Sequence, residues 1–302
     1  MELNSFQEKM RHFLPEIELR FAEPMSRHTS LRIGGPAEVM AFPQNPQELA
    51  HILKVSKELD ITCVILGAGT NILAPDEGYR GLIICLKDCL GGMELLPGNC
   101  IRVMAGVTMA RAAVFAANHG LSGLEFAHGI PGTVGGGVYM NAGAYGGEMS
   151  GICRRVTLMD GAGQLREVNA RELEFSYRHS KLQESGEIVI SAVLQLQPAA
   201  PEEIKQKMRE LQAKRLASQP LDYPSAGSAF KRPAGGYAAA LIDQAGLRGF
   251  QVGQAAIARK HAGFAINLGG ATAAEMRELL TQVSDRVFRQ TGIRLEPEIR
   301  IW

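Results

Sequence analysis

The sequence predicts an α+β protein with one larger and one smaller domain. Helical and strand-like apolar periods alternate along the chain, eight of the 34 glycines lie within residues 129–147, and Pro198-Ala199-Ala200-Pro201 has the composition of a linker. A chain of 302 residues favours two or three domains and can bury a large core without crosslinks. Its 46% apolar and 21% charged residues are typical of a soluble globular protein.

The first third of the chain predicts a β-α-β arrangement. A helix is expected over residues 45–60, because Asn45 can cap it, Pro46 suits its first turn and Glu48 completes a capping box. Apolar runs of strand length follow at residues 62–66 and 82–86. This order is typical of strands that are linked through a helix.

The middle of the chain predicts a helix followed by antiparallel strands. Thr108 can begin the helix and Gly120 can end it. Two strand-like runs, 154–159 and 164–168, flank the turn residues Asp160-Gly161-Ala162-Gly163. Residues 187–197 alternate apolar and other side chains, which predicts a half-buried strand.

The last third predicts two helices and a terminal strand. One helix covers about residues 202–217, and its basic stretch from Lys205 to Arg215 is interpreted as a solvated face. The second helix begins at the capping box of Thr272 and Glu275 and ends near Gly292. Residues 294–302 are expected to form the last strand.

Composition excludes several classes of protein. Lys plus Arg (32) minus Asp plus Glu (31) gives a net charge of +1, so a large nucleic-acid interface is not expected. The five cysteines lack a CxxC pair and the seven histidines lack metal-ligand spacing, so we expect free thiols and no metal. The charged N-terminus has no apolar core and no apolar run reaches membrane-spanning length, which predicts a cytoplasmic protein without membrane insertion.

A first glycine-rich loop follows the strand predicted at 62–66. In Gly67-Ala68-Gly69-Thr70-Asn71, the glycines allow successive amides to form an anion-binding nest, and a plain turn is the alternative. A Rossmann dinucleotide loop is a weaker interpretation, because Ile72 replaces the third small residue and Pro75 breaks the required helix. Asp88, about 20 residues on, is the one feature that favours it.

Two more glycine-rich loops occupy residues 129–137 and 141–147. Such runs lose backbone entropy on folding, so a ligand or a special backbone path must compensate. Backbone wrapped around a flat or phosphorylated ligand is one interpretation, and a structural crossover rich in glycine is the other. A turn is the simpler interpretation of Arg32-Ile33-Gly34-Gly35-Pro36.

These four segments in order, RIGGPA (32–37), GAGTN (67–71), GIPGTVGG (129–136) and NAGAYGGE (141–148), resemble a known flavin-binding domain. It is the one that vanillyl-alcohol oxidase and p-cresol methylhydroxylase share. More narrowly, from about Arg27 to the C-terminus, the chain resembles the UDP-N-acetylenolpyruvoylglucosamine reductase family. The resemblance implies a two-lobed FAD-binding part, 1–80 and 81–200, and a substrate-binding part, 201–302.

The resemblance assigns non-covalent FAD to the glycine-rich loops. The first loop would hold the pyrophosphate, through Gly67, Ala68, Gly69, Thr70, Asn71 and Ile72. The other two would contact the flavin and ribityl chain, through Ile130, Pro131, Gly132, Thr133, Gly135, Gly136, Asn141, Ala142, Gly143 and Gly147. No tyrosine-bearing insertion lies between Phe230 and Glu298, so the chain resembles the shorter, type II members.

Three residues outside the glycine-rich loops match the family's catalytic positions. From the residues alone, Tyr177-Arg178 is an edge aromatic beside a solvated arginine, Ser228 is a turn serine, and Glu296-Pro297-Glu298 is a charged edge. Ser228 is no hydrolase nucleophile, because Phe230 stands where the nucleophile elbow needs glycine. By resemblance, Arg178, Ser228 and Glu298 are catalytic, with Glu298 preferred to Glu296 because it directly precedes the Ile-Arg pair.

The reaction implied by the resemblance is an NADPH-dependent reduction in peptidoglycan precursor synthesis, and hence in cell-wall biogenesis, cell shape, cell cycle and cell division. A hydride from FAD N5 reaches C3 of the enolpyruvyl ether of UDP-N-acetylenolpyruvoylglucosamine, Ser228 protonates C2, and UDP-N-acetylmuramate forms. Arg178 and Glu298 would stabilise the charge that develops on the substrate carboxylate. The further substrate contacts implied are Tyr177, Arg215, Gln219, Gly227 and Arg232.

The partners expected are therefore the UDP-sugar and NADPH, and a monomer is expected. Two alternatives remain open. One is an FAD-dependent oxidase of the same fold that acts on an alcohol or phenol with oxygen. The other is a non-catalytic nucleotide-sugar-binding protein on the same scaffold, but the matches at Arg178, Ser228 and Glu298 argue against it.

Overall fold

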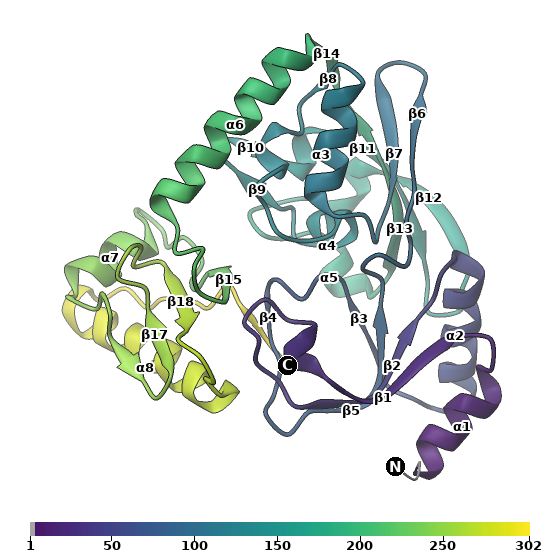
Figure 1. Ribbon diagram of the computed structural model, residues 1–302, viewed down its shortest axis with the longest axis horizontal. Helices are drawn as coiled ribbons and strands as arrows, with labels where there is room; N and C mark the ends of the chain where they lie inside the picture. Colours follow the sequence, from purple (N-terminus) through teal and green to yellow (C-terminus); the bar gives the residue numbers. More distant parts are fainter. Residues whose placement is uncertain (1–3) are drawn as a thin grey trace. The chain divides into compact units, whose positions relative to one another are not determined.

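The computed structural model describes residues 4–302, which fold into two compact units (Figure 1). Unit 1 contains residues 4–21, Val39–Ala68 and Gly81–Ala213. Unit 2 contains Ala22–Glu38, Gly69–Arg80 and Lys214–Trp302. The chain thus passes between the units several times, and the three functional lobes expected at 1–80, 81–200 and 201–302 stay a prediction.

The mixture of helices and strands confirms the predicted α+β class. The first part of the chain contains α1 (Ser5–Phe13), β1 (Glu18–Pro24), β2 (Pro36–Phe42), α2 (Pro46–Glu58), β3 (Cys63–Leu66), β4 (Ile72–Leu73) and β5 (Tyr79–Cys85). β1, β2, β5 and β3 form one sheet in that order, with β3 parallel to β5. Buried side chains of α2, including Leu49 and Ile52, pack with Leu82 and Ile84 of this sheet.

Helix α2 begins as its sequence predicts. The Asn45 side chain accepts a hydrogen bond from the Glu48 amide at 2.9 Å, and Pro46 occupies the first turn. Helix α1 has the same kind of start, a capping box between Asn4 and Gln7, although no helix was expected there. Capping depends on residues three apart, so the signal was present in the sequence in both cases.

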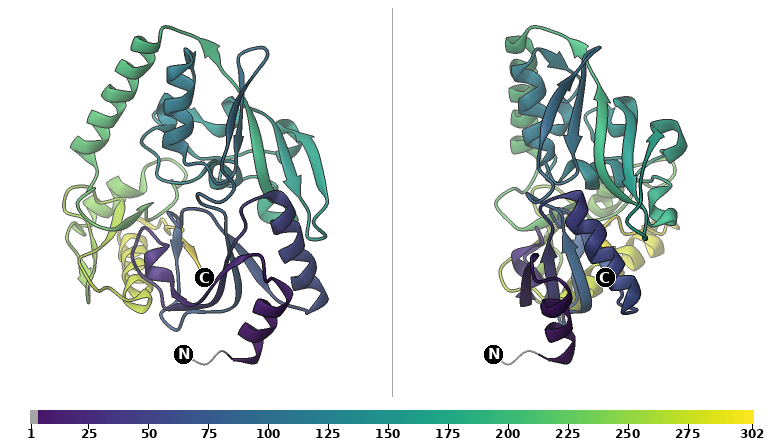
Figure 2. Two further views of the ribbon diagram at one scale, coloured as in Figure 1. Left: turned by 45° about the vertical axis from the view of Figure 1, so that its right-hand side comes forward. Right: turned by 90° about the vertical axis from the view of Figure 1, so that its right-hand side faces the viewer.

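A second sheet forms the centre of unit 1. Its strands are β6 (Met93–Leu96), β7 (Cys100–Met104), β11 (Cys153–Met159), β12 (Leu165–Asn169) and β13 (Ile188–Gln195). They are antiparallel, in the order β12-β11-β13-β7-β6, and β11 and β12 are the predicted hairpin. Helix α3 (Met109–Asn118), capped by Thr108 as predicted, lies on one side of this sheet (Figure 2). Apolar side chains of α3 and of the sheet share one core.

Strand β13 corrects the prediction of a half-buried strand. All its residues from Ile188 to Leu194 are buried. Ile190 belongs to the core that contains α2, whereas Ala192 and Leu194 belong to the core that contains α3. Neighbouring side chains of a strand point to opposite faces, and Val189 belongs to the core with α3 whereas Ile190 belongs to the core with α2, so both faces of β13 are covered.

The glycine-dense segment contains a helix where its composition predicts a loop. α4 (Val134–Tyr139) begins at Thr133, whose side chain accepts from the Gly136 amide at 3.3 Å. Half of its residues are glycine, which disfavours helix by about 1 kcal/mol each relative to alanine, so the pattern indicated a loop. Packing against β13 and β7 overrides this propensity.

Short elements complete unit 1. They are β8 (Leu121–Ser122), β9 (Gly143–Ala144), β10 (Gly147–Glu148), α5 (Leu182–Ser185), β14 (Gln197–Pro198) and the 3₁₀ turns Glu125–Ala127, Met149–Gly151 and Ala170–Leu173. α6 (Pro201–Ser218) carries the chain into unit 2, so the compact units divide within this helix rather than at Pro198–Pro201.

Unit 2 is built on a four-stranded sheet and helix α8. Its elements are the 3₁₀ turn Met25–Arg27, β15 (Ser225–Ser228), α7 (Ala238–Gln244), β16 (Gln251–Val252), β17 (Ala255–Ile257), β18 (Phe264–Asn267), α8 (Ala273–Thr291) and β19 (Arg300–Ile301). The sheet order is β15-β18-β17-β16. Buried side chains of α8, among them Met276, Leu279 and Val283, share a core with Ala255, Ile257 and Ala265 of this sheet.

The C-terminal helix is confirmed, whereas the terminal strand is much shorter than expected. The capping box of Thr272 and Glu275 starts α8, and Gly292 ends it in the left-handed region at φ +72°. Of the predicted strand 294–302, β19 covers only Arg300–Ile301, which pairs in parallel with β4. Pro297 has no amide proton and makes only an isolated bridge, to Phe230.

The cysteines are free thiols, as the sequence predicts. Burial raises the pKa of the Cys153 thiol to about 12 and that of Cys89 to about 11. Neither thiol is therefore a ready nucleophile at neutral pH.

A second cap joins α8 to the loop that follows β4. The Asp76 carboxylate accepts from the amides of Ala273 and Ala274, at 2.7 and 3.0 Å. It therefore satisfies two amides of the first turn, where a negative charge also complements the helix dipole.

We expect Asp76→Ala to lower the thermal midpoint and to destabilise the protein by about 1–2 kcal/mol, the usual cost of a lost helix cap. Hydrogen exchange should increase first at the N-terminal turn of α8. The control is Glu77→Ala, because Glu77 is exposed and caps no helix. Equal midpoints for both variants would contradict this account of Asp76.

Candidate functional site

Gly67, at the start of the first glycine-rich loop, meets the second loop inside unit 1. A Cβ atom added to Gly67 would lie 2.7 Å from Oγ1 of Thr133, so only glycine fits beside that buried threonine. Gly69, in unit 2, has φ +61°, and a Cβ there would overlap the carbonyl oxygen of His28. No helix follows among residues 67–80, which agrees with the rejection of a Rossmann loop.

The second loop is anchored by its backbone. The Met109 amide donates to the Gly132 carbonyl at 2.9 Å, the Val134 amide to Val107 at 2.8 Å, and the Gly135 amide to Ala105 at 2.9 Å. Pro131 and Gly136 remain exposed. A fixed backbone with an exposed rim is suited to binding a ligand through main-chain groups.

The third loop is tied to the segment that carries Arg178. Asn141, which is 1% exposed, donates through Nδ2 to the Ser176 carbonyl at 3.0 Å and accepts at Oδ1 from the Ser150 amide at 2.9 Å. Gly143–Ala144 then pairs with Gly147–Glu148 in a short antiparallel ladder. The Asn141 side chain is thus engaged at both ends within the protein.

Arg178 lies in a tight turn with a strained backbone. The amide of Ser176 donates to the carbonyl of His179 and the reverse bond is also present, at 3.1 and 3.2 Å. Arg178 has φ +55°, which costs a residue with a side chain of order 1–3 kcal/mol. Its Nη2 donates to the Gly143 carbonyl at 3.2 Å, so the predicted catalytic arginine lies beside the third loop.

Ser228 and Glu298 are brought together in unit 2. β15 contains a bulge between Ser225 and Ser228, where Gly227 has φ +77°, and Ser228 is exposed at its end. The next residue, Ala229, accepts from the Glu298 amide at 2.9 Å. The predicted serine and glutamate therefore come from adjacent backbone segments that lie 70 positions apart in the chain.

The two glutamates of the last segment have different environments. Glu296 is exposed and forms an ion pair with Lys231. Glu298 is half-buried, and its backbone bonds to Ala229 and Asn71. The choice of Glu298 over Glu296 as the functional residue stays a prediction.

The predicted substrate contacts are divided between the units. Tyr177 belongs to unit 1 and is 49% exposed, whereas Arg215, Gln219, Gly227 and Arg232 belong to unit 2. The Arg232 guanidinium carbon lies 4.3 Å from the ring centroid of Tyr237. Oε1 of Gln219 is buried and has no hydrogen-bond partner among residues 4–302.

The glycine-rich loops fit FAD on two observations. Gly67 brings the backbone of the first loop against Thr133 of the second loop, whose own backbone is anchored. His128, immediately before the second loop, has a buried Nδ1 without a partner in the described part of the chain. Buried polar atoms are normally satisfied, so an unpaired one beside such loops is consistent with a bound polar group.

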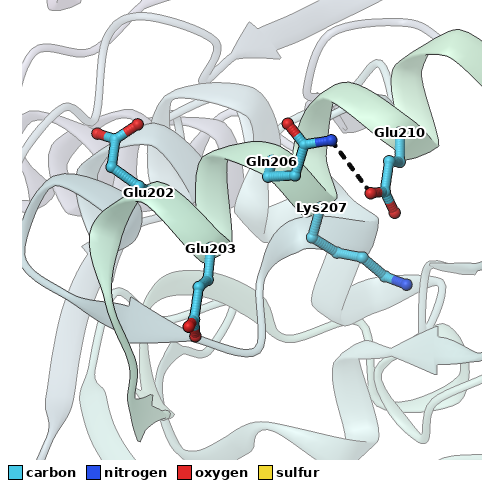
Figure 3. Close-up of a pocket in the computed structure, with 5 residues that line it drawn as sticks. All are labelled: Glu202, Glu203, Gln206, Lys207 and Glu210. Atoms are coloured by element: carbon cyan, nitrogen blue, oxygen red, sulfur yellow. Dashed lines mark hydrogen bonds between the residues drawn. The ribbon is translucent and has the colours of Figure 1, made fainter.

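Other surface features do not compete with this site. Figure 3 shows an open hollow along α6, lined by Glu202, Glu203, Gln206, Lys207 and Glu210. Pairs within the helix, such as Gln206 with Glu210, make it the solvated face that the sequence predicts.

In the described residues there is no cluster of three or more His, Cys, Asp or Glu suited to a metal. No helix between residues 4 and 302 is long and apolar enough to span a membrane.

Comparison with known proteins identifies two family domains in the chain. A model described as an FAD binding domain matches residues 37–169, and one described as the C-terminal domain of UDP-N-acetylenolpyruvoylglucosamine reductase matches residues 219–302. The fold resembles a cholesterol oxidase variant from Brevibacterium sterolicum, with a TM-score of 0.50 and 15% identity, over 66% of this chain and 40% of that one.

The most informative relatives cover nearly the whole chain. UDP-N-acetylenolpyruvoylglucosamine reductase of Agathobacter rectalis is 44% identical over 98% of both chains, and that of Syntrophomonas wolfei is 43% identical over 96% of both. The crystal structure of the Thermus caldophilus reductase gives a TM-score of 0.78 at 34% identity, covering 95% of this chain and 98% of that one. The chain belongs to the UDP-N-acetylenolpyruvoylglucosamine reductase family.

Proposed function

We propose that this protein reduces the enolpyruvyl ether of UDP-N-acetylenolpyruvoylglucosamine to UDP-N-acetylmuramate, with NADPH as the source of reducing equivalents. Membership of the reductase family supports an FAD-dependent oxidoreductase. The observation that carries the finer assignment is the hydrogen bond from the Glu298 amide to Ala229, because it holds the matched glutamate beside the matched serine. The product is a precursor of peptidoglycan, which implies a role in cell-wall synthesis.

The cofactor loops supply a main-chain cradle. The main chain of residues 67–72 would hold the pyrophosphate, and residues 130–136 and 141–147 would contact the flavin and ribityl chain, which suits loops in which glycine permits close approach. FAD, when bound, supplies hydride transfer between NADPH and C3 of the enolpyruvyl group. The protein's own part is to bind, orient and protonate.

Arg178 is proposed to bind the substrate carboxylate. Negative charge develops there as C3 gains a hydride, so a cation at this position stabilises the transition state more than the ground state. A guanidinium can donate two parallel hydrogen bonds to a carboxylate. The left-handed backbone of Arg178 and its bond to Gly143 fix the direction of the side chain, which supports this role.

Ser228 is proposed to give the proton to C2, with Glu298 assisting at the developing charge. The exposed hydroxyl of Ser228 at the end of β15 is accessible to a substrate. A serine hydroxyl is a poor acid by itself, so a neighbouring charge or a water chain must stabilise its conjugate base. A protonated Glu298 would donate a hydrogen bond to the substrate carboxylate and so stabilise the charge that develops there.

The remaining predicted contacts would bind the nucleotide part of the substrate. Arg215 and Arg232 carry positive charge that suits a diphosphate. Gln219 offers a side-chain amide, and Gly227 offers backbone groups that no side chain covers. Tyr177 lies in the same turn as Arg178. A monomeric, cytoplasmic enzyme with these partners stays a prediction from sequence.

The purified protein should be yellow and should lose its flavin absorbance when NADPH is added without oxygen. Addition of UDP-N-acetylenolpyruvoylglucosamine should then restore the absorbance, because the substrate reoxidises the cofactor. An oxidase of the same fold would instead turn over an alcohol or phenol without NADPH. A colourless protein that cannot be reconstituted with FAD would refute the proposal.

Ser228→Ala should leave flavin reduction by NADPH unchanged and slow reoxidation by the substrate by about 10²–10⁴-fold, the usual contribution of a general acid. Stopped-flow absorbance measures the two half-reactions separately. Ser225→Ala, in the same strand, is the matched control and should resemble the wild type. If Ser228→Ala slows both half-reactions equally, Ser228 is not the proton donor.

Arg178→Lys should slow reoxidation by the substrate by about 10²-fold, because a lysine cannot replace two parallel donors at a developing oxyanion. Reduction by NADPH should stay within about threefold of the wild type. Arg171→Lys, at an exposed position in the same unit, is the control. Wild-type reoxidation in Arg178→Lys would count against its place at the carboxylate.

A further inference from the structure

The main chain of Glu298 is held from both sides within unit 2. Its amide donates to the carbonyl of Ala229 at 2.9 Å. Its carbonyl accepts from Nδ2 of Asn71 at 3.1 Å. One bond comes from the segment of Ser228 and the other from the first glycine-rich loop, so Glu298 links the two.

Asn71 is itself held in place by the C-terminal segment that contains Glu298. Its carbonyl accepts from the amide of Arg300 at 3.0 Å, and the next residue, Ile72, pairs with Arg300 in the parallel ladder of β4 and β19. The side chain of Asn71 adds a second contact two residues earlier, at Glu298. Two bonds between Asn71 and one short segment restrict both its position and its rotation.

These two hydrogen bonds fix the direction in which the Glu298 side chain leaves the backbone. A hydrogen bond to the Glu298 carbonyl fixes the peptide plane between Glu298 and Ile299, and the bond to its amide fixes the preceding plane. With both planes fixed, the Cα–Cβ direction of Glu298 is set, and its carboxyl group has only side-chain rotations left. The main chain of Glu296 is held by the Lys231 amide, which donates to its carbonyl at 2.9 Å, and its carboxylate pairs with the Lys231 side chain.

The same loop also restrains the strand that carries Ser228. The amide of Ser30 donates to the Gly69 carbonyl at 3.0 Å, and its hydroxyl donates to the Ser225 carbonyl at 2.7 Å. The loop 69–71 is therefore connected to both segments that bear the proposed catalytic residues of unit 2.

We propose that Asn71 is a positioning residue for Glu298: its side-chain amide sets the direction of the catalytic glutamate. The inference rests on the proposed function, since the role of Glu298 does. It differs from the role that the family resemblance implies for Asn71, which is contact with the FAD pyrophosphate. The two roles make different predictions for the two half-reactions and for FAD affinity.

Asn71→Asp tests the proposal. The carboxylate has the size of the amide but cannot donate, so it faces the Glu298 carbonyl with an unfavourable contact. We expect flavin reoxidation by UDP-N-acetylenolpyruvoylglucosamine to slow by about 10²-fold, the usual effect of misplacing a reacting group by about 1 Å. Flavin reduction by NADPH and the Kd for FAD should each stay within about threefold of the wild type.

Two further variants keep the test decisive. Asn71→Ala removes the donor without adding charge, so it should show the same selective loss, and it serves if Asn71→Asp does not fold. Asn99→Asp adds the same charge at an exposed position in unit 1 and should behave as the wild type.

The outcomes separate the alternatives. A weaker Kd for FAD with normal reoxidation at saturating FAD would show a cofactor contact and overturn the proposal. Equal slowing of both half-reactions, or no change in either, would also overturn it. If the wild-type flavin is not reoxidised by the substrate at all, the proposed function fails, and that result is distinct from any difference between variants.

Discussion

The contact between Thr133 and Gly67 is the constraint on which unit 1 depends. Thr133 caps α4 through the Gly136 amide, bridges to Thr108 at the start of α3, and lies where Gly67 leaves room for its hydroxyl. One buried threonine therefore sets the start of a helix and the distance between two glycine-rich loops. A side chain on Gly67 would separate them, which explains why flexible glycine is used at a rigid position.

Hydrogen bonds connect the C-terminal end of α4 to the turn that holds Arg178, the proposed substrate-binding arginine. At the end of the helix, the Tyr139 carbonyl accepts from Oγ of Ser180 at 2.7 Å and from Nε2 of Gln183 at 3.2 Å. Gln183 also donates to the Arg178 carbonyl at 3.1 Å. These neutral hydrogen bonds, each worth about 1 kcal/mol net, offset the strained backbone of Arg178. The strain persists because the surroundings of the turn determine its conformation.

Features that depend on near neighbours in sequence could be predicted, and features that depend on distant segments could not. The caps at Asn45, Thr108 and Thr272 were correct because each involves residues three positions apart. The helix α4 was missed because tertiary packing outweighs the low helix propensity of glycine. The burial of both faces of β13 could not be predicted, because the two cores that cover this strand are formed by segments distant from it in the sequence.

The choice between Glu296 and Glu298 shows how local and distant information combine. The residues alone describe a charged edge, and the resemblance selects Glu298 by its position before Ile299 and Arg300. The reason for that position lies in the register of β19 with β4, which brings the carbonyl of Glu298 to the side chain of Asn71. A shift of two residues would bring Glu296 to the Asn71 side chain and would remove that bond from Glu298. The short pairing of β19 with β4 therefore determines which of the two glutamates has its carbonyl bound by Asn71, so a ladder of two residue pairs has a role far larger than its length.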